Sequence, residues 1–105
     1  MLERTLFYSP LAKQDLDEIF NYIAYELENP SSATETVSAI LDAAESLEGF
    51  PLIGSPVKGL PFATDEYRFL GARNYLIFYR VMDSRIFVDR ILYSRRDYLP
   101  LLGLQ

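Results

Sequence analysis

The sequence predicts a two-layer α+β domain, in which a helical hairpin packs on an antiparallel sheet in the order β-α-α-β-β-β. Apolar residues recur at helical spacing through the first half of the chain, and strand-forming runs fill the second half. No segment between the halves has the composition of a linker. The 105 residues are therefore expected to form one domain, 1–105.

The first two elements are a short strand within residues 2–8 and a long amphipathic helix. Ser9 and Pro10 are typical of a helix start, with Ser as the N-cap and Pro at the first helical position. The predicted buried stripe of this helix is Leu16, Ile19, Phe20, Ile23 and Leu27. Pro30 ends it, because the residue before a proline is pushed out of the helical region.

A second helix is predicted directly afterwards, so that the two form an antiparallel hairpin. Ser32 and Glu35 have the spacing of a capping box, and Gly49 is expected to stop the helix. Its predicted apolar stripe is Val37, Ile40, Leu41, Ala44 and Leu47. Residues 49–61, which contain three Pro and three Gly, predict an irregular loop.

The remaining strands form the part around which the chain is organised. They are predicted at residues 66–70, 75–82 and 86–93, with a turn at residues 71–74 and a final turn at residues 99–104. Asp83-Ser84 joins the last two strands as a two-residue turn that pairs Met82 with Arg85. This register predicts the pairs Arg80–Phe87, Phe78–Asp89 and Leu76–Ile91. The expected core face carries Tyr75, Ile77, Tyr79, Val81, Ile86, Val88 and Leu92, with Arg90 as its only charge.

The amino-acid composition excludes several kinds of functional site. The chain has no cysteine and no histidine, which removes disulfides, Cys-type zinc sites and the usual general base. Phosphate-loop, Rossmann and metal-ligand spacings are absent, so no cofactor and no metal are expected. The sequence also lacks a signal-peptide pattern and any apolar run long enough to span a membrane. We therefore expect a cytoplasmic protein without membrane contact.

The net charge of −5 is unevenly distributed. Residues 1–57 hold ten acidic and two basic residues, whereas residues 58–105 hold five acidic and eight basic ones. The acidic half is expected to repel nucleic acid, and the basic half suits an anion or an acidic partner. Asp15, Asp17 and Glu18 scatter around the first helix, which favours a solvated face over a carboxylate site.

The candidate functional residues are arginines on the sheet or just after it. An arginine cluster with aromatic neighbours can clamp phosphates or stabilise developing negative charge. The alternative is that these arginines pair with carboxylates of the strands, as Arg80 can do with Asp89 diagonally across from it. The residues predicted to contact a target are Arg73, Arg80, Arg90, Arg95, Arg96 and Tyr98.

Three segments carry a family resemblance: SPLAKQDLDEIFNYI, YRFLGARNYLIFYRV and DRILYSRRDYLPLL. In this order and spacing the chain resembles, over nearly its whole length, the RelE/ParE superfamily of toxins from bacterial type II toxin–antitoxin systems. The resemblance implies a cognate antitoxin and a hetero-oligomer with it. RelE-like members are ribosome-dependent mRNA endoribonucleases, whereas ParE-like members act on DNA gyrase. A non-toxic degenerate member is a third possibility.

The RelE pattern is only partly present. Its basic positions match at Arg68 and Arg96. Two further basic positions and the catalytic Tyr position are taken by Leu70, Leu76 and Leu102. A nuclease would then depend on Arg68, Arg96 and Tyr98, the last about one helical turn too early.

The ParE-like branch fits better. At the end of the chain, an apolar strand is followed by an Arg-Asp pair and then by leucines, as in the ParE-like form. Tyr93 stands where many ParE-like chains have His, and the sequence assigns it no role. A ribosome-bound nuclease also works in an rRNA field and is typically basic, unlike this chain. We therefore expect a gyrase-inhibiting toxin rather than an enzyme, with the ribosome and mRNA as the alternative target. Its antitoxin is expected to lay an amphipathic segment in an apolar groove, with its charges toward the arginines.

Overall fold

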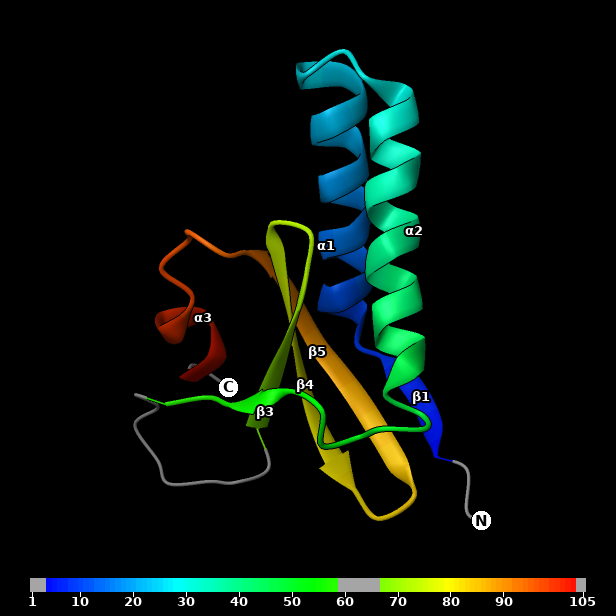
Figure 1. Ribbon diagram of the computed structural model, residues 1–105. Coiled ribbons are helices and arrows are strands. Elements are labelled where there is room, and N and C mark those ends of the chain that lie inside the picture. The colour runs from blue at the N-terminus through cyan, green and yellow to red at the C-terminus, as the bar shows by residue number, and fades with distance from the viewer. Residues whose placement is uncertain (1–3, 59–66, 104–105) are drawn as a thin grey trace.

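Two helices pack on one face of a five-stranded sheet in the computed structural model, which describes residues 4–58 and 67–103 (Figure 1). The elements are β1 (Thr5–Tyr8), α1 (Pro10–Asn21), the π-helical turn η1 (Tyr22–Glu26), α2 (Pro30–Ser46), β2 (Ser55–Pro56), β3 (Tyr67–Ala72), β4 (Tyr75–Met82), β5 (Arg85–Tyr93) and α3 (Leu99–Gly103). The predicted two-layer α+β class is confirmed. The sheet order is β1-β5-β4-β3-β2, and the sheet is mixed because β1 joins β5 in parallel.

α1 begins as predicted. The Ser9 hydroxyl oxygen accepts a hydrogen bond from the Ala12 N–H at 2.9 Å, which caps the helix. The helix does not continue regularly to Leu27, because η1 widens its last turn and the Leu27 N–H donates to the Tyr22 carbonyl five residues back. Leu27, predicted in the buried stripe, is consequently 55% exposed.

α2 begins earlier than predicted. Its N-cap is Asn29, whose Oδ1 accepts from the Ser32 N–H at 3.2 Å, and Pro30 occupies the first turn. The capping-box prediction of Ser32 and Glu35 was therefore wrong. An Asn-Pro pair satisfies both preferences of a helix start, which are a polar cap and a proline with a fixed φ.

A β-bulge divides the hairpin of β4 and β5. The predicted pairs Met82–Arg85 and Arg80–Phe87 are present, and the register then shifts between Phe78 and Tyr79. Asp89 is the extra residue, since Tyr79 pairs with Val88 and Phe78 with Arg90. The predicted pairs Phe78–Asp89 and Leu76–Ile91 were wrong; the observed pairs are Phe78–Arg90, Ile77–Ile91 and Leu76–Leu92.

The bulge reverses the faces of Ile91 and Leu92, which follow it on β5. Ile91 packs in the main core between the helices and the sheet, whereas Leu92 belongs to a second cluster with Phe78 and Leu102 on the other face. α3 covers this second cluster (Figure 1). Strict alternation along β5 predicts the opposite faces for these two residues, and the bulge makes that prediction wrong.

The predicted boundaries of the other elements are nearly correct. The expected loop 49–61 contains the two-residue strand β2, and the expected strand 66–70 extends to Ala72. Residue 66 and residues 59–61 lie outside the described part of the chain. No helix within residues 4–58 and 67–103 has the length and apolarity needed to cross a membrane.

Candidate functional site: a groove between the helices and the sheet

An open groove of about 670 Å³ lies between the helical hairpin and the end of the sheet at which β3 turns into β4. The helical side of the groove is lined by Asp15, Glu18, Ile19, Tyr22, Ile23, Leu27, Ser32 and Thr36. The sheet side is lined by Arg73, Asn74, Tyr75, Ile91, Leu92, Tyr93 and Arg96. One side thus carries acidic and apolar groups, and the other carries arginines and aromatic rings.

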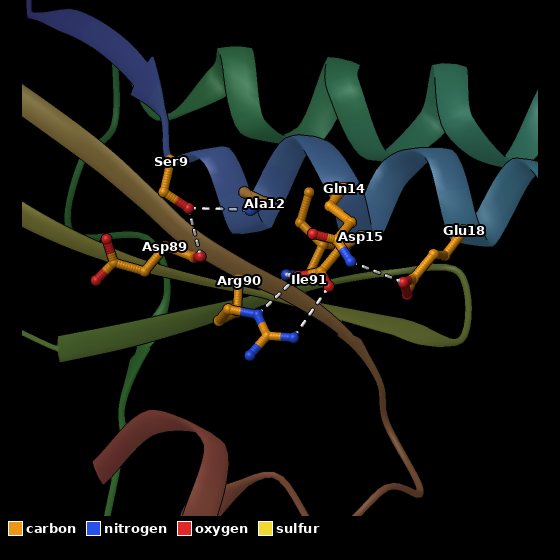
Figure 2. A network of polar contacts seen from close by, with 8 residues as sticks. All are labelled: Ser9, Ala12, Gln14, Asp15, Glu18, Asp89, Arg90 and Ile91. Atoms are coloured by element: carbon orange, nitrogen blue, oxygen red, sulfur yellow. Dashed lines mark hydrogen bonds and ion pairs between the residues drawn. The ribbon is translucent and has the colours of Figure 1, made fainter. Parts of the chain in front are cut away.

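Asp15 joins the two layers at this groove (Figure 2). Its Oδ2 accepts hydrogen bonds from Arg90 Nε and from the Ile91 N–H, both at 2.9 Å, and its Oδ1 accepts from Arg90 Nη2 at 3.0 Å. Asp15 is only 6% exposed. The hydrogen bond to Asp15 raises the pKa of Arg90 above its usual value, against the opposing effect of burial. The expectation that Asp15 belongs to a solvated face was wrong.

The end of β1 explains why Asp15 is needed. β1 pairs with β5 only as far as Tyr8 and Val88, so the backbone groups of Asp89 and Ile91 require other partners. α1 supplies them. The Ser9 hydroxyl donates to the Asp89 carbonyl at 2.7 Å, and Asp15 accepts from the Ile91 N–H (Figure 2). The first turns of α1 therefore replace the missing strand along this edge.

Two of the predicted arginines lie in the groove and are free to bind a partner. Arg73 is in the β3–β4 turn and Arg96 follows β5, and both are exposed. Within residues 4–58 and 67–103, neither guanidinium group has an ion-pair partner. A carboxylate on a bound segment can therefore reach two unpaired cations on the sheet side.

Three tyrosines, Tyr22, Tyr75 and Tyr93, line the same groove. The rings of Tyr75 and Tyr93 meet edge to face, with their centroids 5.8 Å apart. Burial raises the pKa of Tyr75, and the neighbouring phenols of Tyr22 and Tyr93 raise it further. The phenol groups add hydrogen-bonding groups and aromatic surface to the lining of the groove. The sequence left the role of Tyr93 open, and the structure brings it to the groove.

The other predicted arginines on the sheet are engaged within the chain. Arg80 forms the predicted ion pair with Asp89, at 2.7 Å from Nε to Oδ2 and 3.2 Å from Nη2 to Oδ1. Arg90 is bound to Asp15, as described above. Arg68 Nη1 donates to the Gly54 carbonyl at 2.8 Å. Of these contacts, only the Arg80–Asp89 pair joins an arginine to a strand carboxylate as the alternative predicted; Arg90 binds a carboxylate of α1 and Arg68 binds a backbone carbonyl.

The residues of the nuclease hypothesis do not converge. Arg96 lines the groove with the helices, whereas Arg68 is bound to Gly54 and the Tyr98 ring packs on Phe78 in the second cluster, 5.0 Å from centroid to centroid. Arg95 is exposed but does not line the groove. Among the described residues, no cluster of three acidic or metal-binding side chains could hold a metal ion.

Arg73 adopts an unusual backbone conformation. Its φ is 57°, in the left-handed region that costs an L-residue roughly 1–2 kcal/mol. Backbone strain is often stored where a side chain has a function. We expect Arg73→Gly to be more stable than Arg73→Ala by about 1 kcal/mol, because both lose the guanidinium group and only Gly relieves the strain. Urea unfolding of the two variants measures this difference, and equal stability would argue against strain at Arg73.

Comparison with known proteins assigns the family. Residues 6–98 match the family described as ParE toxin of type II toxin-antitoxin system, parDE. The chain belongs to the ParE toxin family. The predicted membership in the RelE/ParE superfamily is confirmed, and the chain is a toxin component of a type II toxin–antitoxin system. No match was found among curated proteins.

Solved structures share the fold of this ParE-family chain. A structure described as a chromosomal ParDE system from P. aeruginosa has a TM-score of 0.72 at 23% identity, covering 89% of this chain and 98% of that one. The RelBE2 complex from Mycobacterium tuberculosis has a TM-score of 0.64 at 18% identity, covering 88% and 99%. The DinJ-YafQ complex from E. coli has a TM-score of 0.60 at 14% identity, covering 88% and 93%.

Proposed function

We propose that this ParE-family toxin inhibits DNA gyrase by binding it, and that a cognate antitoxin neutralises the toxin by binding in the groove. The observation that carries the antitoxin site is the pair of unpaired guanidinium groups, Arg73 and Arg96, on the sheet side of a groove whose helical side carries apolar and acidic groups. We further propose that residues 1–105 act as one cytoplasmic domain in a hetero-oligomer with the antitoxin.

The groove suits an amphipathic helix. Such a helix is about 10 Å across, and its apolar stripe would pack on Ile19, Ile23 and Leu27. Carboxylates along one border of that helix would pair with Arg73 and Arg96. An antitoxin with an acidic, amphipathic segment is therefore complementary to this part of the toxin, although the toxin as a whole is acidic.

Inhibition by binding is favoured over RNA cleavage. The residues that a RelE-like mechanism would use are separated, and Arg68 already donates to a backbone carbonyl. The chain offers no histidine as a general base. Among the arginines predicted to contact a target, Arg95 is exposed and stays a candidate, whereas Arg80 and Arg90 are bound to Asp89 and Asp15.

Controlled expression of the chain alone in bacteria tests this proposal. We expect growth arrest with intact mRNA and altered DNA supercoiling, because a gyrase inhibitor leaves transcripts uncut. Transcript integrity and plasmid topology are measured in the same cells. Arrest with cleaved mRNA would instead support the RelE-like alternative, and unimpaired growth would support a non-toxic member of the family.

A further inference from the structure

Three large apolar side chains point into solvent from the loop that follows α2. Phe50, Leu52 and Ile53 are 67%, 63% and 58% exposed. We call residues 50–53 the apolar loop. Single exposed apolar residues are common on protein surfaces, but three within four positions form a patch that normally marks an interaction site.

The apolar loop is held rigidly. The hydroxyl of Tyr79, a residue with 0% exposure on β4, donates to the Pro51 carbonyl at 2.8 Å and accepts from the Gly54 N–H at 3.0 Å. On the far side, Arg68 donates to the Gly54 carbonyl. A Cβ on residue 54 would lie 2.6 Å from the Tyr79 hydroxyl oxygen, so Gly54 is required for this close approach.

This rigidity has a consequence for binding. A side chain that is already fixed loses less conformational entropy when it enters a partner's pocket. A buried tyrosine, an arginine and a glycine thus hold this loop in place, although its largest side chains contribute little to the core. This arrangement is typical of a preformed apolar anchor at an interface.

The charges around the apolar loop indicate the kind of partner. Glu45 and Glu48, both exposed, precede the loop, and Arg68, the cation described above at its other end, is hydrogen-bonded to the Gly54 carbonyl. A second copy docked symmetrically would bring the same carboxylates together, which is unfavourable. A partner with an apolar pocket and a basic rim is complementary to this surface.

The apolar loop is also well separated from the groove. Ser32 and Thr36, near the start of α2, line the groove, whereas the loop follows the other end of the helix (Figure 1). At about 1.5 Å per residue, the ten residues from Thr36 to the end of α2 at Ser46 separate the groove from the loop by roughly 15 Å. We infer that the apolar loop is the surface by which this toxin docks on its protein target, in a basic-rimmed apolar pocket. This inference rests on the proposed function.

The test combines three substitutions, Phe50→Ser, Leu52→Ser and Ile53→Ser. Purified gyrase in a supercoiling assay is the probe, together with growth arrest on expression. We expect the triple variant to need at least about tenfold more protein for half-inhibition than the wild type, since hot-spot side chains are removed. The double variant Leu11→Ser/Met82→Ser is the matched control, because it removes side chains that are 52% and 40% exposed elsewhere.

Each outcome supports or overturns the inference. Inhibition by the triple variant at wild-type strength overturns it, even if the proposed function stands. A wild-type chain that neither arrests growth nor inhibits gyrase removes the proposed function, and the inference with it. A wild-type dimer in sedimentation analysis that the triple variant converts to a monomer would assign the surface to self-association instead.

A second variant keeps the test valid if the triple variant does not fold. Tyr79→Phe retains all three apolar side chains and removes both hydrogen bonds to the loop. We expect a smaller but measurable loss of gyrase inhibition, with the circular dichroism spectrum unchanged. Full inhibition by Tyr79→Phe would contradict the role given to rigidity.

Discussion

Replacing Asp15 by Ala is expected to lower the free energy of unfolding by about 3–5 kcal/mol, because it leaves the largely buried Arg90 side chain, 14% exposed, without its carboxylate. The substitution also removes the acceptor of the buried Ile91 N–H, on the side of β5 along which β1 has already ended. Domains of this size are stable by only about 5–15 kcal/mol, so much of the stability would be lost. Urea unfolding followed by circular dichroism measures the change.

Two further variants show how much of this stability comes from the charge of Asp15 and how much from its hydrogen bond to the Ile91 N–H. Asp17→Ala removes an exposed carboxylate two residues along α1 and should change stability by less than about 0.5 kcal/mol. Asp15→Asn retains an oxygen for the Ile91 N–H but no charge for Arg90, so we expect an intermediate loss. A loss below about 1 kcal/mol for Asp15→Ala would contradict the assignment of Asp15 as the link between the layers.

The main helices and strands could be predicted from the sequence because each carries a local signal, whereas the two-residue strand β2 and the π-helical turn η1 were not predicted. Periodicity located both helices and the central hairpin, and the cap at Ser9 and the ion pair of Arg80 with Asp89 followed from spacing alone. The bulge at Asp89 could not be predicted in this way. Ile91 and Leu92 are both apolar, so either one can face the main core, and the pattern does not show where the alternation is interrupted.

The candidate site was less predictable than the fold, because its residues depend on tertiary structure. Asp15 lies four residues before Ile19 and therefore on the buried stripe of α1, unlike Asp17, but only the early end of β1 at Tyr8 gives it a backbone donor and an arginine on β5 as partners. Tertiary structure also decides which of the predicted arginines have a partner within the chain. The fold brings Arg90 into contact with Asp15, whereas Arg73 and Arg96 line the groove and have no carboxylate partner among the described residues.

Reversing the charge of those two arginines is expected to weaken the complex with the antitoxin at least about 100-fold. In the double variant Arg73→Glu/Arg96→Glu, two proposed ion pairs become like-charge contacts at the border of the groove, where close charge pairs couple by about 1.5 kcal/mol or more. Titration calorimetry with the cognate antitoxin measures the affinity. The matched control is Arg85→Glu/Arg95→Glu, which changes the net charge equally at exposed positions that do not line the groove.

The two double variants distinguish a local contact from a general effect of charge. If long-range repulsion of an acidic antitoxin were responsible, both would weaken binding alike, and high salt would restore both. If the groove is the site, only Arg73→Glu/Arg96→Glu loses most of its affinity. Because the apolar loop lies at the other end of α2, this variant should still arrest growth, and co-expression of the antitoxin should no longer relieve the arrest. Loss of toxicity in the same variant would mean that the target and the antitoxin share the groove.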